Sequence, residues 1–149
     1  AHFHQWEILK PRQQDEDRQT PAYSYYRCHL NNDGISDFAL VITTGRDSTL
    51  AEHFVALVSE GNKYNLSVLK SFKVSDHDFA QFELLILREQ TFVATFGHNE
   101  RFPSELREHE TNDGIYFDVD CVSISSKGNN YCFTYVHFSK GFFEFSSCD

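Results

Sequence analysis

Oxygen-bearing side chains recur at alternating positions in the stretch that follows Cys28, as they do in a calcium-binding loop. We count His29 as the first position of an EF-hand loop. Asn31, Asp33 and Asp37 then fall at ligand positions, and a glycine occupies the sixth position, where the loop turns sharply. The pattern is incomplete, because histidine replaces aspartate at the first position and no acidic residue stands at the twelfth. We therefore expect either a weakened site, with calcium as an optional ligand, or a purely structural Asn-Asp-Gly turn.

The same stretch joins two runs of residues that favour strands. The run Ala22–Leu30 is rich in tyrosine, and Asp37–Thr44 contains the bounded apolar segment FALVI. Asn, Asp and Gly tolerate the left-handed backbone of a tight turn. The pattern predicts an antiparallel pair, and similar turns follow at short intervals.

The whole chain alternates apolar runs with polar turns. Short connections favour antiparallel pairing of consecutive runs, including Phe82–Leu87 with Thr91–Phe96. The sequence predicts an all-β fold, with residues 1–149 as one antiparallel domain of about ten strands and little helix; a curved sheet, a sandwich and a partial propeller remain open. The expected strands are His2–Leu9, Ala22–Leu30, Asp37–Thr44, His53–Ser59, Tyr64–Phe72, Phe82–Leu87, Thr91–Phe96, Ile115–Ser125, Tyr131–Phe138 and Phe142–Ser146.

Four cysteines occur without any C-x-x-C pair, which disfavours a zinc ribbon or a thioredoxin-type site. A three-residue hairpin loop with Gly141 in its left-handed third position places Cys132 directly opposite Cys148. We predict a disulfide between these two and, by elimination, a second one between Cys28 and Cys121. The alternative is a set of four reduced cysteines packed as small apolar groups.

Composition and charge limit the functional classes. A formal net charge of −9 at pH 7 disfavours nucleic acid as a partner and favours encounter with a basic protein. No apolar run approaches the length of a membrane-spanning helix. The even cysteine count and the absence of Met, even at position 1, favour an oxidising compartment reached after removal of a signal peptide.

Sequence motifs of catalysis are absent. There is no G-x-S-x-G elbow, H-E-x-x-H helix, P-loop or G-x-G-x-x-G turn. Asp118 and Asp120 would share one face of an expected strand, but nothing marks the cleft that a glycosidase pair requires. We therefore expect no catalytic residues and no enzymatic activity.

A family resemblance lies in the first two-thirds of the chain. Trp6 with Ile8-Leu9, followed by the run HLNNDGISDFALV that starts at His29, resembles small exported bacterial proteins with a DLNxDGxxDxAxV turn. These proteins are loosely related to FG-GAP and VCBS-type repeats. The resemblance implies a periplasmic or exported protein, lipid-anchored in some precursors. By analogy of class, small β-rich periplasmic proteins with disulfides include immunity proteins against toxins of secretion systems such as type VI.

These observations lead to a functional hypothesis. The chain is expected to be a non-catalytic periplasmic inhibitor that neutralises a basic, cell-wall-degrading toxin. The alternative is a calcium-stabilised structural module of the envelope without a tight partner. The long charged stretch Gly97–Thr111 is the expected contact loop, with Lys10–Pro21 as a second one. The candidate partner-binding residues are Glu100, Arg101, Phe102, Glu105, Arg107 and Glu108.

Overall fold

The computed structural model describes residues 6–8, 25–94, 111, 114–126, 132–138 and 142–148. Within these ranges the backbone is almost entirely strand, with one short 3₁₀ helix, η2 (Asp47–Thr49), and no α-helix. Every pair of described strands is antiparallel, which confirms the antiparallel all-β class that the sequence predicts. The strands are β1 (Trp6–Ile8), β2 (Tyr25–Cys28), β3 (Asp37–Thr44), β4 (Ala51–Glu60), β5 (Lys63–Lys73), β6 (Phe82–Leu87), β7 (Phe92–Ala94), β8 (Gly114–Tyr116), β9 (Cys121–Ser126), β10 (Cys132–Phe138) and β11 (Phe142–Cys148).

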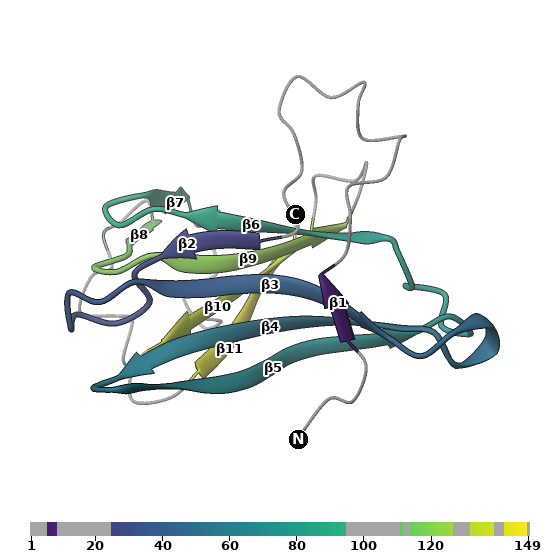
Figure 1. Ribbon diagram of the computed structural model, residues 1–149. Helices are drawn as coiled ribbons and strands as arrows, with labels where there is room; N and C mark the ends of the chain where they lie inside the picture. Colours follow the sequence, from purple (N-terminus) through teal and green to yellow (C-terminus); the bar gives the residue numbers. More distant parts are fainter. Residues whose placement is uncertain are drawn as a thin grey trace.

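The strands form two larger sheets and a short pair. The first sheet has the order β1-β3-β4-β5, with β2 also paired to β3. The second sheet has the order β11-β10-β9-β6, and β7 pairs with β8. Figure 1 shows the first sheet in front of β9, β10 and β11, so that the two sheets form two layers.

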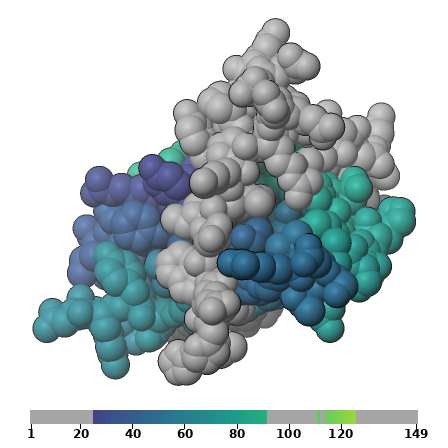
Figure 2. All heavy atoms as spheres, turned by 45° about the vertical axis from the view of Figure 1, so that its right-hand side comes forward, coloured from purple at the N-terminus to yellow at the C-terminus, as the bar shows by residue number. Residues whose placement is uncertain are grey.

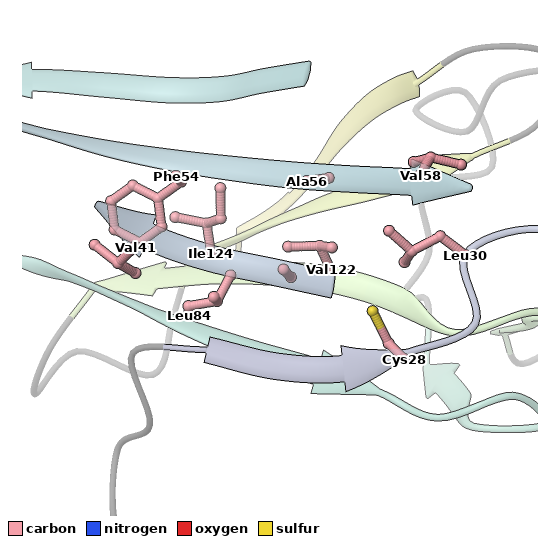
Figure 3. Close-up of a cluster of buried hydrophobic side chains, with 10 residues drawn as sticks. Cys28, Leu30, Val41, Phe54, Ala56, Val58, Leu84, Val122 and Ile124 are labelled. Carbon is pink, nitrogen blue, oxygen red and sulfur yellow. The ribbon is translucent and has the colours of Figure 1, made fainter. Parts of the chain in front are cut away.

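The core lies between these two layers (Figure 3). On the first sheet, alternate residues point inward, among them Val41 of β3 and Phe54 of β4. On the second sheet, Leu84 of β6 and Ile124 of β9 meet them from the other side. The rest of the buried cluster consists of Cys28, Leu30, Ala39, Ala56, Val58 and Val122.

An aromatic row links the two sheets at one margin of this core. Phe54 and Phe72 meet edge to face, with ring centroids 6.0 Å apart. Phe72 of β5 in turn stacks on Phe82 of β6, with centroids 5.0 Å apart and planes 3° from parallel. Such pairs add to the burial energy of the rings, and this row ties the first sheet to the second.

Two glycines allow the turns that flank β3. Gly34 has φ +76° in the Asn-Asp-Gly turn and is open to solvent. Gly45 has φ +75°, and a Cβ there would collide with the backbone carbonyl of Thr49. The first position needs glycine for its backbone conformation and the second also for space.

One predicted strand pairing and the extent of one predicted strand are wrong. Phe82–Leu87 does not pair with the strand that follows it, because β6 lies beside β9 and β7 pairs with β8. The expected strand Ile115–Ser125 is divided into β8 and β9 by residues 117–120. The break has a physical reason, because Asp120 turns inward and bonds to backbone groups of distant segments instead of continuing the ladder.

The cysteine predictions have different outcomes. Cys28 and Cys121 are both buried and form no disulfide with each other, so the predicted bond between them is wrong. Cys28 belongs to the core cluster together with Val122, and strand alternation therefore turns Cys121 to the opposite face of its sheet. The predicted register of the last hairpin is confirmed, since Cys132 lies opposite Cys148 and Phe138 opposite Phe142. The disulfide at that position stays a prediction.

Candidate functional site

The Asn-Asp-Gly turn is held by the carboxyl group of Asp37, which is fully buried. Its Oδ2 accepts a hydrogen bond from the Leu30 backbone N–H at 2.6 Å. Its Oδ1 accepts from the Ser59 backbone N–H at 2.8 Å and lies 2.9 Å from the Ser59 hydroxyl. One carboxyl group at the start of β3 thus fixes the end of β2 and the end of β4.

The three predicted calcium ligands are brought together, and they meet on Ser59. The Asn31 amide donates to the Ser59 carbonyl at 3.1 Å, and the Ser59 hydroxyl lies 2.6 Å from Asp33 Oδ2. Asp33 Oδ1 accepts from the Ile35 backbone N–H at 2.8 Å, which closes an Asx turn. The Ser59 hydrogen bond, more than any other contact, lowers the pKa of Asp33 below its ordinary value. Sequence reasoning identified these three residues but not Ser59, which joins them.

These contacts are those of a structural turn. Both oxygens of Asp33 and both oxygens of Asp37 already accept hydrogen bonds, and Asn31 directs its amide nitrogen, not its oxygen, at Ser59. Calcium takes six to eight converging oxygen ligands, whereas Ser59 directs N–H and O–H donors at the carboxylate oxygens of this turn. Among the described residues no group of three or more His, Cys, Asp or Glu side chains is arranged to hold a metal ion.

Calcium addition should therefore leave the melting temperature unchanged. A ligand that binds only the folded state raises the melting temperature, and a bound calcium ion would have to displace the hydrogen bonds at Ser59. Differential scanning fluorimetry with millimolar calcium, with magnesium as the control cation, measures this. A rise with calcium alone would restore the calcium-stabilised alternative.

A second buried carboxyl group lies next to the first. Asp120 Oδ2 accepts hydrogen bonds from the His29 backbone N–H at 2.9 Å and from Arg88 Nη1 at 3.0 Å. Its Oδ1 accepts from the Glu89 backbone N–H at 2.9 Å, and its own backbone N–H donates to the His29 carbonyl. Two consecutive backbone amides, of His29 and Leu30, are thus held by two different aspartates. Asp120 connects β2 of the first sheet to the end of β6 and the start of β9 in the second.

Cys28 lies beside these two carboxyl groups, with its sulfur directed into the core (Figure 3). Burial, followed by the negative charges of Asp120 and Asp37, raises the pKa of the Cys28 thiol from 9.0 to about 12. The thiol is therefore neutral at physiological pH and is a poor nucleophile. It serves as an apolar side chain of the core.

This raised pKa predicts a loss of stability in alkali. Between pH 9 and about 12 the unfolded chain loses the thiol proton while the folded chain keeps it, so stability falls as pH rises. The free-energy advantage of the wild type over Cys28→Ala should be constant below pH 9 and should shrink by roughly 1 kcal/mol per pH unit above it. Urea unfolding of both proteins from pH 8 to pH 11 measures this. An advantage that stays constant over this range would contradict the prediction.

A histidine links three strands on the outer face of the first sheet. His53 Nε2 lies 2.8 Å from the Thr44 hydroxyl and Nδ1 lies 2.8 Å from the Ser71 hydroxyl. Burial lowers the pKa of His53, which favours the neutral ring. A catalytic serine–histidine pair would place a carboxyl group at the second ring nitrogen, where this site has a threonine hydroxyl. The arrangement therefore ties β3, β4 and β5 together.

At the β5 edge of the first sheet, which no other described strand extends, an apolar row is exposed. Tyr64, Leu66 and Val68 of β5 are 47%, 43% and 41% exposed, and their spacing of two places them on one face. Among the described strands β5 pairs with β4 alone. In Figure 2 the teal atoms of the β4–β5 hairpin project at the lower left of the surface. An exposed apolar row on an unpaired edge is a recognised feature of interaction sites.

The row is held in place by contacts to β3. The Tyr64 ring packs against Phe38 with centroids 6.0 Å apart, and its hydroxyl donates to the Ser36 carbonyl at 3.0 Å. Leu66 lies opposite Leu57 of β4, which faces away from the core. The predicted partner-binding residues are outside the described residues: Glu100, Arg101, Phe102, Glu105, Arg107 and Glu108. So are the whole of the predicted contact loop Lys10–Pro21 and all of Gly97–Thr111 except Thr111.

Comparisons with known proteins add no family. No protein-family model, curated protein or solved structure matches the chain. The likeness to exported proteins with a DLNxDG-type turn thus stays a resemblance carried by one motif. In the part of the chain that the structure describes, no helix is long and apolar enough to cross a membrane.

Proposed function

We propose that this chain is a non-catalytic binding domain that acts by docking on another protein. The observation that carries the proposal is the apolar row Tyr64, Leu66 and Val68, exposed along the β5 edge of the first sheet. An exposed apolar row costs solubility and invites aggregation unless a partner covers it. The scaffold behind it is rigid, because buried carboxyl groups and an aromatic row fix the sheet.

The chemistry of the described polar groups supports a role without catalysis. The two buried carboxyl groups, of Asp37 and Asp120, are each engaged by several donors. The imidazole of His53 is engaged by two hydroxyls, and the Cys28 thiol is neutral in the core. Each of these groups stabilises the fold, which leaves the surface as the functional part.

The biological role we propose is inhibition of a partner protein in an exported compartment, as immunity proteins do for secreted cell-wall-degrading toxins. The net charge of −9 would speed encounter with a basic partner. The fold, which we take to be a two-layer sandwich, suits a rigid inhibitor because little ordering is needed on binding. Calcium is not required in this proposal.

Affinity capture from an extract of the native organism tests the proposal. The wild type should retain one stoichiometric protein at moderate salt, and Leu66→Glu should lose it, because a buried carboxylate in the row is costly. Tyr25→Glu is the matched control, since Tyr25 is 57% exposed on β2, which β3 and β4 separate from β5. An empty column for the wild type would contradict the proposal and would favour a structural envelope module.

A further inference from the structure

The Asn-Asp-Gly turn contains a chemically reactive pair of residues, Asp33 and Gly34. The carboxyl group of an aspartate can cyclise onto the backbone nitrogen of the next residue, and glycine hinders this attack least because it has no Cβ. Both residues are exposed, and nothing lies within 4 Å of the place that a Cβ of Gly34 would occupy. The turn therefore has room for a cyclic intermediate and for the water that opens it.

The reaction at this pair needs only water as a co-reactant. The Gly34 nitrogen attacks Cγ of Asp33, an N–Cγ bond forms, and the amide proton leaves with the carboxyl hydroxyl group as water. A second water then opens the cyclic imide. If the N–Cγ bond breaks, aspartate is restored. If the bond from the nitrogen to the backbone carbonyl carbon breaks, the chain continues through Cγ and the product is isoaspartate.

The carboxyl group of Asp33 is restrained at both of its oxygens. Oδ1 accepts a hydrogen bond from the Ile35 backbone N–H at 2.8 Å, and Oδ2 accepts one from the Ser59 hydroxyl at 2.6 Å. Ser59 is itself fixed, because its N–H donates to Asp37 and its carbonyl accepts from the Asn31 amide. Ser59 is 1% exposed, so water does not compete for its hydroxyl. Cyclisation requires the carboxyl group to rotate toward the next backbone nitrogen, which breaks these hydrogen bonds.

We propose that Asp33–Gly34 is a site of isoaspartate formation and that the Ser59 hydroxyl is the positioning group that restrains the conversion. Isoaspartate lengthens the backbone by one methylene and removes the side-chain carboxyl group that holds the turn to β4. The Ser36 carbonyl of the same turn accepts from the Tyr64 hydroxyl at 3.0 Å, so the conversion also loosens one support of the exposed row. The reaction needs no partner and is therefore independent of the proposed function.

Ageing of the full chain at neutral pH tests this inference. Ser59→Ala removes the hydroxyl and keeps the backbone contacts of residue 59. Isoaspartate at Asp33 should therefore accumulate roughly five- to tenfold faster than in the wild type, in line with the loss of one hydrogen bond. Ser59→Cys, whose thiol is a weaker donor, should give an intermediate rate. A synthetic peptide spanning residues 29–37 lacks the restraint and should convert fastest.

Peptide mapping measures each site separately. The chain contains two Asp-Gly pairs, which fall in the tryptic peptides 28–46 and 108–127. Electron-transfer fragmentation of each peptide distinguishes isoaspartate from aspartate. Asp113–Gly114 stands in the same Asn-Asp-Gly-Ile tetrapeptide as Asp33–Gly34 and serves as an internal reference. Its rate should be the same in the wild type and in Ser59→Ala.

A core variant distinguishes restraint by Ser59 from a general loss of stability. Val41→Ala creates a cavity opposite Phe54, five residues along β4 from Ser59, and should leave the rate at Asp33 close to that of the wild type. Circular dichroism before ageing establishes that the variants are folded.

Three results would overturn the inference. Equal rates at Asp33 in the wild type and in Ser59→Ala would show that the hydroxyl does not restrain the reaction. An equally large increase in Val41→Ala would assign the increase to global unfolding. Absence of isoaspartate at Asp33 in Ser59→Ala, while the peptide converts, would show that the folded turn does not react.

Discussion

Replacing Asp37 with alanine should destabilise the protein by about 3–5 kcal/mol, a large fraction of the stability of an ordinary domain. The substitution leaves the backbone N–H groups of Leu30 and Ser59 buried without an acceptor, since both donate to this carboxyl group. Leu30 and Ser59 are 0% and 1% exposed, so water cannot replace the lost acceptor. Chemical denaturation followed by circular dichroism measures the loss.

The variant Asp37→Asn separates hydrogen bonding from packing. Asparagine has nearly the same volume, but one of its two polar atoms is a donor and would face an N–H group. We expect a loss close to that of alanine, because the site needs acceptors on both sides. Asp33→Ala should cost much less than either Asp37 variant, because that carboxyl group is exposed. A mild effect of Asp37→Asn would show that volume, not acceptor geometry, stabilises the turn.

The strands were predictable because their signals are local. The runs that became β3, β4, β10 and β11 show apolar segments bounded by turn residues, and the register of the last hairpin followed from the position of Gly141. The turn at Gly34 was recognised for the same reason. These features depend on residues close together in the chain.

The pairing of distant strands was not predictable in the same way. Nothing near Phe82–Leu87 indicates that its neighbour is β9, since that choice depends on which apolar face of the second sheet meets the core. The inward turn of Asp120 was equally hidden, because its partner His29 lies 91 residues away. The one local sign that the strand is interrupted there is Asp120, a charged residue between the apolar residues Val119 and Cys121.

In the candidate site, too, features set by neighbouring residues were predictable and contacts between distant residues were not. Asn31, Asp33 and Asp37 were identified from spacing, but spacing does not distinguish a calcium loop from a hydrogen-bonded turn. That distinction depends on Ser59, which lies 22 residues from Asp37 and adds donors where a metal site needs open oxygens. The exposed row on β5 was also invisible, because periodicity indicates a face without indicating whether another layer covers it.

Replacing Asp120 with alanine should cost about 3 kcal/mol and should weaken the connection between the two sheets. The carboxyl group accepts from the backbone of His29 in the first sheet and from Arg88 and Glu89 at the end of β6 in the second. Its side chain is 6% exposed, whereas that of Arg88 is 57% exposed. Most of the loss should therefore arise from the two backbone donors and not from the ion pair.

A double-mutant cycle separates the contribution of the Asp120–Arg88 ion pair from that of the backbone hydrogen bonds. Arg88→Ala alone should cost about 1 kcal/mol or less, and its coupling to Asp120→Ala should be of similar size, because solvent screens the exposed guanidinium. Glu89→Ala is the matched control, since Glu89 contacts Asp120 through its backbone N–H and keeps that contact as alanine. If Glu89→Ala or Arg88→Ala destabilised the protein as strongly as Asp120→Ala, side-chain charges at the end of β6 would account for the lost stability, which would contradict the prediction. If Asp120→Ala alone is severe, one buried carboxyl group joins the sheets, because it satisfies backbone donors that no neighbouring side chain can reach.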